Sequence, residues 1–318
     1  MSPTSQTIPR LPLDGMQGAI SSLIVGCDNQ PDLDLASALW DAWWEAGGNG
    51  FDTAHIYGQG LHEQNLGAWM RSRGVAAQAR VIVKGAHTPN CLPEAIEQQL
   101  TVSLDRLGLD HAPVYIMHRD NADVPVAEFV DVLDDLHSRG LIGAIGGSNW
   151  SVTRFAEARA YAQANGRRGL SLLNNNLSLA VMERPVWAGC ITSNQPEALA
   201  FLRAGGVTHL SCSSQARGFF MGAGERTALP DDTAPDTCFA SADNEERRRR
   251  AETLAAEYGV HPHNIATAWV LGQGFPSLAL IGPRTIDEIR TTLPALGLQL
   301  SAGEIAWLNL EQDARQPE

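Results

Sequence analysis

The sequence lacks the features typical of membrane, secreted and metal-clustered proteins. No run approaches the roughly 18 apolar residues that a membrane-spanning helix needs, so we expect no membrane partner. The first residues, MSPTSQTIPRLPLDG, have neither the basic start nor the apolar stretch of a signal peptide. The five cysteines are an odd set without a CxxC pair or a zinc-like spacing. We therefore expect a reduced, cytoplasmic protein that holds no metal.

Positive charge is also scarce. The chain has 23 Lys and Arg against 36 Asp and Glu, a formal net charge of −13. Such a charge opposes nonspecific binding to nucleic acid or to an anionic membrane. The basic run RRRR at 247–250 directly follows DNEE. We interpret it as the solvated face of a helix start, with a nucleic-acid patch as the alternative. The expected partner is a small molecule, and the oligomeric state stays open.

Short apolar segments alternate with helical patterns along most of the 318 residues, and 44% of the residues are hydrophobic, which suits a core-forming protein. The strand-like segments are SSLIV (21–25), GNGFDT (48–53), RVIVKGA (80–86), PVYIMH (113–118), IGAIGGS (142–148), LSLLNN (170–175), THLSCSS (208–214) and SLALIGP (277–283). Repeated βα units with apolar strands indicate a parallel sheet buried on both faces. Eight such units favour a single-domain (β/α)8 barrel. A doubly wound dinucleotide fold is the alternative, but GCDNQP follows the first strand where that fold would have GxGxxG.

One segment interrupts this rhythm. Residues 217–244, after the seventh strand, are rich in Gly, Pro, Asp and Thr and show no apolar period. A connection of this length is typical of a lid or a mobile loop. We expect it to be mobile.

Polar residues end the second, third and fourth strands. Asp52, Lys84 and His118 occupy these ends, and Tyr57 lies in the loop just beyond Asp52. In a (β/α)8 barrel these positions face one shared site. A tyrosine has an unperturbed pKa near 10, which a nearby lysine cation lowers, while an aspartate keeps the lysine charged. Such a set suits proton delivery to a carbonyl oxygen as hydride reaches its carbon.

Each of these residues also has a simpler interpretation. Asp52 could cap a helix, Lys84 could pair with a structural carboxylate, Tyr57 could be an ordinary loop aromatic, and His118 could be a core histidine. Their appearance together, in order, at successive strand ends favours the catalytic interpretation.

On these residues the chain resembles the aldo-keto reductase family over nearly its whole length. GFDTAHIYG resembles the family's Asp and Tyr segment, VIVKGA its lysine strand, YIMHRD its histidine strand, and GAIGGSNWS its strand ending in Ser-Asn. The resemblance implies that Tyr57 is the general acid, that Lys84 and Asp52 tune it, and that His118 orients the substrate. It also implies NADPH as the cofactor, with NADH possible.

The same resemblance implies a cofactor site at the barrel mouth. Its residues would be Gly26, Cys27, Asp52, Ser148, Asn149, Asn174, Cys212, Ser213, Ser214, Arg217, Gly282, Arg284, Glu288 and Thr292. Ser148 and Asn149 would bind the nicotinamide carboxamide, and Arg284 a 2′-phosphate. The chain departs from the family at Asn174, where a Gln is usual, and at Cys212, where the family has a Tyr that stacks on the nicotinamide. Glu288 stands where the family more often has Arg or Gln, and Thr292 stands where it more often has Asn.

Three further residues are candidates for the substrate pocket: His55, Trp150 and Trp187. Packing in the core or a loop is the simpler interpretation of both tryptophans. The expected substrate is an aldehyde, a ketone or a sugar-derived carbonyl.

Two other functions stay open on this sequence. A metal-dependent barrel hydrolase or isomerase would use Asp52, His55 and His118, although the HxH strand signature is missing. A cofactor-binding sensor with little turnover would account for the departures at Cys212, Asn174 and Glu288.

Overall fold

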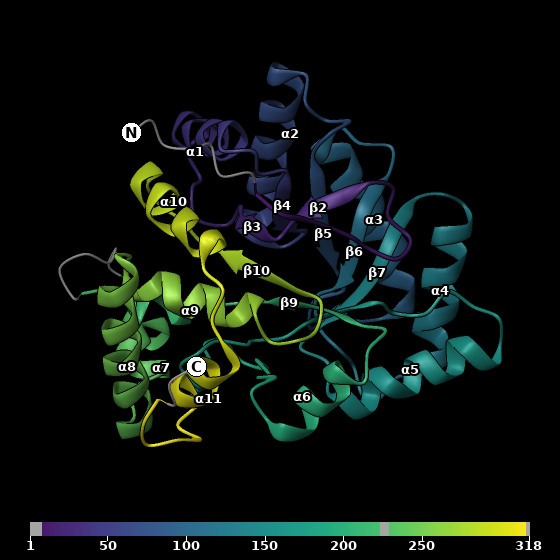
Figure 1. The fold of residues 1–318 in the computed structure, drawn as a ribbon. Helices are drawn as coiled ribbons and strands as arrows, with labels where there is room; N and C mark the ends of the chain where they lie inside the picture. Colours follow the sequence, from purple (N-terminus) through teal and green to yellow (C-terminus); the bar gives the residue numbers. More distant parts are fainter. Residues whose placement is uncertain (1–7, 223–228, 316–318) are drawn as a thin grey trace.

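Eight parallel strands close into a barrel in the computed structural model, which describes residues 8–222 and 229–315 (Figure 1). Around the barrel the strand order is β10, β3, β4, β5, β6, β7, β8, β9, and back to β10. The strands are β3 (Leu23–Gly26), β4 (Gly50–Ala54), β5 (Arg80–Gly85), β6 (Ala112–Met117), β7 (Ile142–Ser148), β8 (Leu172–Asn174), β9 (Thr208–Ser211) and β10 (Ser277–Ile281). Each overlaps one of the eight segments expected from the sequence, so the predicted single-domain (β/α)8 barrel is confirmed.

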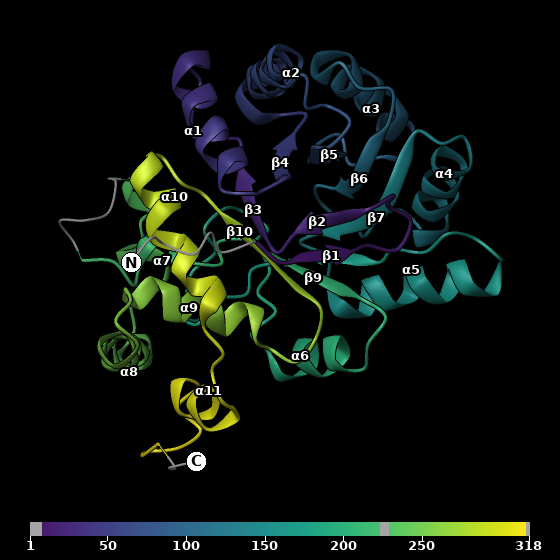
Figure 2. The same cartoon turned by 45° about the horizontal axis from the view of Figure 1, so that its top comes forward.

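Helices surround this barrel (Figure 2). They are α1 (Leu33–Glu45), α2 (Leu61–Arg73), α3 (Pro93–Leu107), α4 (Val126–Ser138), α5 (Val152–Ala164), α6 (Pro196–Arg203), α7 (Pro235–Cys238), α8 (Ala242–Tyr258), α9 (Pro262–Leu271), α10 (Ile286–Thr292) and α11 (Ala302–Leu308). Short 3-10 turns add η1 (Tyr57–Gly60), η2 (Ala216–Gly218), η3 (Asp231–Thr233) and η4 (Leu293–Gly297). Side chains cap several of the helices; for example, Asp32 accepts a 2.9 Å hydrogen bond from the Leu35 amide at the start of α1. None of the helices described is long and apolar enough to cross a membrane.

An antiparallel hairpin that the sequence reasoning did not anticipate precedes the barrel. Its strands are β1 (Arg10–Pro12) and β2 (Ala19–Ser21), and β3 begins two residues after β2 ends. Leu13, Met16 and Ile20 of the hairpin region share one apolar cluster with residues of the barrel interior such as Ile82 and Leu278. The hairpin therefore covers the N-terminal end of the barrel and leaves the C-terminal end as the open one.

The segment 217–244 is only partly irregular. It contains part of η2, all of η3 and α7, and the start of α8, and Phe219, Phe220 and Phe239 are buried. These apolar side chains anchor the segment beside the barrel, although their spacing follows no regular period. Residues 223–228 lie outside the described residues, so the mobility of this segment stays a prediction.

The expectation of a solvated basic face at 247–250 was wrong for one of its residues. Arg250 in α8 is only 7% exposed, and its Nη1 donates to the carbonyl oxygens of Trp307 (2.6 Å) and Gln312 (2.7 Å). Arg249 is exposed and pairs with Glu246 at 2.7 Å. Arg250 therefore ties the C-terminal segment to α8, because a guanidinium has enough donors to serve two carbonyls at once.

Candidate active site

Backbone strain gathers at the C-terminal ends of the barrel strands. Ala86 after β5, Asn149 after β7, and Ser213 and Arg217 after β9 have positive φ angles of 56°, 58°, 48° and 59°. Left-handed conformations are costly for residues other than glycine and cluster at functional sites. The C-terminal end of the barrel is therefore the candidate position of the active site.

Tyr57, Lys84 and Asp52 meet there in one hydrogen-bonded chain. Lys84 Nζ lies 2.6 Å from Asp52 Oδ2 and 3.0 Å from the Tyr57 hydroxyl oxygen. Parallel pairing of β4 with β5 sets Lys84 beside Ala54, two residues past Asp52, and η1 returns Tyr57 over the same strand ends. The three side chains thus converge as the sequence predicted.

Lys84 and Asp52 form an almost fully buried ion pair, with 5% and 4% of their side chains exposed. Burial opposes the lysine charge, but Asp52 and Tyr57 outweigh it, so the pKa of Lys84 is raised. Burial also raises the pKa of Asp52, against the attraction of Lys84. Each charge therefore offsets part of the cost of burying the other.

The pKa of Tyr57 moves opposite to the expectation. Burial raises it above its ordinary value, and the Lys84 cation only limits the rise. The sequence indicated that a lysine would lower this pKa, but it could not show that burial of the phenol would raise it by more. Tyr57 consequently carries its proton at neutral pH, which a general acid requires.

His118 is held neutral beside Tyr57, with ring centroids 5.6 Å apart in an edge-on arrangement. Burial lowers the pKa of His118 well below its ordinary value, and Lys84, Arg119 and His87 lower it further. Nδ1 of His118 is buried and has no hydrogen-bond partner among the described residues. Because a buried N–H is rarely left without an acceptor, we place the proton on Nε2, which makes that nitrogen a donor for a substrate oxygen.

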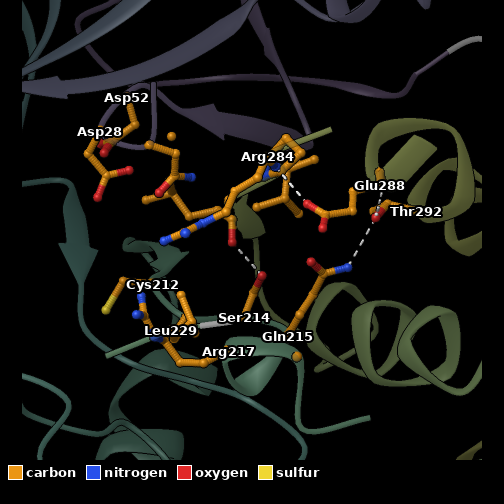
Figure 3. Close-up of a pocket in the computed structure, with 18 of the residues that line it drawn as sticks. Asp28, Asp52, Cys212, Ser214, Gln215, Arg217, Leu229, Arg284, Glu288 and Thr292 are labelled. Atoms are coloured by element: carbon orange, nitrogen blue, oxygen red, sulfur yellow. Dashed lines mark hydrogen bonds between the residues drawn. The ribbon is translucent and has the colours of Figure 1, made fainter. Parts of the chain in front are cut away.

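A cleft leads from these residues across the barrel mouth to α10 (Figure 3). Its lining residues are Gly26, Asp28, Asn29, Asp52, Tyr57, Lys84, Trp187, Cys212, Ser213, Ser214, Gln215, Arg217, Gly218, Met221, Leu229, His263, Leu280, Ile281, Gly282, Pro283, Arg284, Glu288, Thr291 and Thr292. Most residues expected at the cofactor site are among them. Burial raises the pKa of the Cys212 thiol to about 12, so this thiol is neutral and a poor nucleophile at neutral pH.

Four residues expected at the cofactor site do not line this cleft. Asn149 Nδ2 donates to Ser148 Oγ (3.0 Å), and Asn174 Nδ2 donates to the Leu210 carbonyl (2.8 Å). Cys27 is 3% exposed. At the ends of β7 and β8 these amide donors satisfy the protein's own acceptors.

Two of the three substrate-pocket candidates lie elsewhere. His55 Nδ1 is 3.4 Å from both Ser103 Oγ and Arg106 Nη1, on the side of α3. Trp150 is fully buried in the helix layer, so the packing interpretation holds for it. Trp187 does line the cleft, is 42% exposed, and lies 5.1 Å from the guanidinium of Arg217.

Sequence reasoning missed several groups of the site. Asp28 and Gln215 line the cleft, and His87 lies 4.8 Å from the His118 ring. Asp28 and His87 each lie two residues beyond a strand end, and that position was the available signal.

Two strand-end glycines, Gly26 and Gly282, line the cleft where a side chain would be crowded. A Cβ on Gly26 would lie 3.3 Å from Asp28 Oδ1, and a Cβ on Gly282 would lie 3.2 Å from Asn29 Nδ2. Side chains at these positions would crowd polar atoms that line the cleft. Across residues 8–222 and 229–315 no three His, Cys, Asp or Glu are grouped so that they could hold a metal ion.

The chain belongs to the aldo/keto reductase family, whose model matches residues 24–309. It is similar to the uncharacterized oxidoreductase YrpG of Bacillus subtilis, with 27% identity and 91% of each chain covered. Two other relatives differ in the cofactor that their names carry. Aldo-keto reductase yakc (NADP(+)) of Schizosaccharomyces pombe is 24% identical, covering 86% of this chain and 79% of the relative. The NADH-specific methylglyoxal reductase of Escherichia coli is 26% identical, covering 67% and 62%. The protein is therefore an oxidoreductase of a family that uses nicotinamide cofactors.

A solved structure supports the fold independently. The thermostable aldo-keto reductase Tm1743, determined with the inhibitor epalrestat, superposes with a TM-score of 0.74 at 21% identity. The match covers 95% of this chain and 99% of that one. It confirms the barrel architecture.

Proposed function

We propose that the protein reduces an aldehyde or ketone, sugar-derived carbonyls included, to the alcohol with NADH or NADPH. The observation that carries this proposal is the Lys84 ammonium, which lies 3.0 Å from a Tyr57 hydroxyl and 2.6 Å from the Asp52 carboxylate. A protonated phenol next to a fixed cation can give its proton to an oxygen that gains negative charge.

Each residue has a distinct task in this reaction. Tyr57 donates the proton from its hydroxyl oxygen, and Lys84 stabilises the phenolate that remains. Asp52 holds Lys84 in place. His118 donates from Nε2 to the substrate oxygen and orients it toward Tyr57.

The cleft is the proposed cofactor site. Gly26, Ser213, Arg217 and Gly282 would hold the cofactor, since they line the cleft between Tyr57 and α10. When bound, the reduced nicotinamide supplies the hydride. Cys212 offers no aromatic face at the position where the family stacks a tyrosine, which weakens binding there by on the order of 1 kcal/mol.

That departure also supports a second candidate, a cofactor-binding protein with little turnover. One experiment separates the two functions. The purified protein is mixed with NADH or NADPH and a panel of aldehydes, ketones and aldoses, and oxidation of the cofactor is followed by absorbance. Saturable reduction of at least one carbonyl supports the reductase. Cofactor binding without reduction of any carbonyl supports the second candidate.

The pH dependence follows from the two shifted groups. The pKa of His118 is lowered from an ordinary value near 6.5, and that of Tyr57 is raised from an ordinary value near 10. Between about pH 6 and pH 10 His118 is therefore neutral and Tyr57 protonated, and kcat/KM for reduction is expected to be flat. Alcohol oxidation needs the phenolate and should rise with pH over the same range. A reductive profile that falls with an apparent pKa inside this range would contradict the assignment.

We further propose a reducing cellular compartment. All five cysteines are free, and Cys27, Cys91 and Cys238 are buried. Free buried thiols are usual where disulfides do not form.

A further inference from the structure

The end of the cleft at α10 carries an acidic side chain, that of Glu288. Arg284, Glu288, Thr291, Thr292, Gln215 and His263 line this end. If the cofactor lies along the cleft from Tyr57, as the proposed function requires, its adenosine half reaches these residues. An acidic side chain suits a ribose with a free 2′-hydroxyl, whereas an arginine suits a 2′-phosphate.

The carboxylate of Glu288 is fixed at the first turn of α10. Its Oε2 accepts a 2.6 Å hydrogen bond from the backbone N–H of Arg284, and its own backbone N–H donates to Thr285 Oγ1 at 3.2 Å. Two backbone donors at this turn, the N–H groups of Arg284 and Glu288, therefore already bind the protein's own oxygens.

The neutral side-chain donors nearby also already make hydrogen bonds within the protein. Thr291 Oγ1 donates to the Asp287 carbonyl (2.9 Å), and Thr292 Oγ1 donates to the Glu288 carbonyl (2.8 Å). Gln215 Nε2 donates to Thr267 Oγ1 (3.2 Å) and Thr292 Oγ1 (3.3 Å). A 2′-phosphate would have to displace these bonds, whereas ribose hydroxyls bring donors of their own.

Arg284 does not place its charge beside Glu288. Figure 3 shows its side chain extending away from Glu288 and toward the side of the cleft where Asp28 lies. Gln30 Nε2 donates to the Arg284 carbonyl oxygen at 3.3 Å, which helps to hold the backbone from which this side chain extends. The guanidinium thus lies over the middle of the cleft.

We infer that Glu288 selects a cofactor without a 2′-phosphate, so that the protein prefers NADH to NADPH. This inference deepens the proposed function and revises the expectation of NADPH that Arg284 suggested. The carboxylate accepts hydrogen bonds from the ribose hydroxyls and repels a phosphate at the same position. Specificity of this kind needs a repulsive element as well as an attractive one.

The test is equilibrium binding without substrate, followed by the fluorescence of each reduced cofactor at fixed ionic strength. The wild-type protein is expected to bind NADH at least roughly tenfold more tightly than NADPH. Glu288→Gln should tighten NADPH roughly tenfold and change NADH by less than about threefold. The matched control is Asp287→Asn, the same loss of charge one residue earlier on an exposed side chain that pairs with Arg290 at 3.4 Å. It should leave both affinities within about twofold.

A competition experiment on the wild-type protein needs no substitution and guards against a variant that fails to fold. Adenosine 5′-monophosphate is expected to displace bound NADH at lower concentration than adenosine 2′,5′-bisphosphate does. Tighter NADPH binding in the wild type, or unchanged selectivity in folded Glu288→Gln, would overturn the inference and leave the reductase proposal intact. Binding of neither cofactor would instead refute the proposed function itself.

Discussion

Tyr57→Phe is expected to lower kcat for carbonyl reduction by roughly 100-fold or more, the scale of lost general acid catalysis. The substitution removes the hydroxyl that lies 3.0 Å from Lys84 Nζ and keeps the ring that lies edge-on to His118. Cofactor affinity should stay nearly unchanged, because only a proton donor is lost. The measurements are kcat from cofactor oxidation and Kd from cofactor fluorescence.

The matched control is Tyr115→Phe. Tyr115 in β6 is fully buried, and its hydroxyl has no hydrogen-bond partner among the described residues. Loss of an unpaired hydroxyl from the core should leave kcat and the denaturation midpoint almost unchanged. Equal activity of Tyr57→Phe and Tyr115→Phe would rule out Tyr57 as the acid.

Lys84→Met is expected to abolish reduction and to destabilise the fold by about 3–5 kcal/mol, the cost of leaving one charge of a buried pair without its partner. Asp52 would lose the cation at 2.6 Å, and its Oδ1 already has no hydrogen-bond partner in the described part of the chain. The free energy of unfolding in urea and kcat are the two readouts.

The double variant Asp52→Asn/Lys84→Met distinguishes the two effects. Removing both charges should recover much of the lost stability, because no unpaired charge remains, and should recover no activity. A single Lys84→Met variant as stable as the wild type would show that the pair carries no buried charge. An active one would show that Tyr57 needs no lysine.

The barrel could be predicted because its strands are buried on both faces and so appear as continuous apolar runs between helical patterns. The β1–β2 hairpin could not, since its strands have only three residues each, too few to show an apolar or alternating pattern. Arg250 was misassigned for a related reason: the sequence shows four arginines in a row, and only the fold shows that one of them turns toward the C-terminal segment.

The catalytic residues could be predicted from strand-end positions, because parallel pairing brings successive strand ends together. Side-chain direction could not be predicted in this way. His55 follows a strand end as Tyr57 does, yet it turns to Ser103 and α3. The sign of the Tyr57 pKa shift was missed for a similar reason, since desolvation depends on neighbours far away in the sequence.

The most direct measurement of the central claim follows hydrogen from cofactor to product. Reduced nicotinamide cofactor deuterated at the transferable C4 position is incubated with the protein and a carbonyl that it reduces, and the alcohol is analysed by mass spectrometry. Direct hydride transfer predicts one deuterium on the former carbonyl carbon when the cofactor is deuterated and the solvent is ordinary water. With unlabelled cofactor in deuterated solvent, it predicts no deuterium at that carbon. An alcohol whose new C–H hydrogen comes from solvent, or no alcohol from any carbonyl in the panel, would contradict the account.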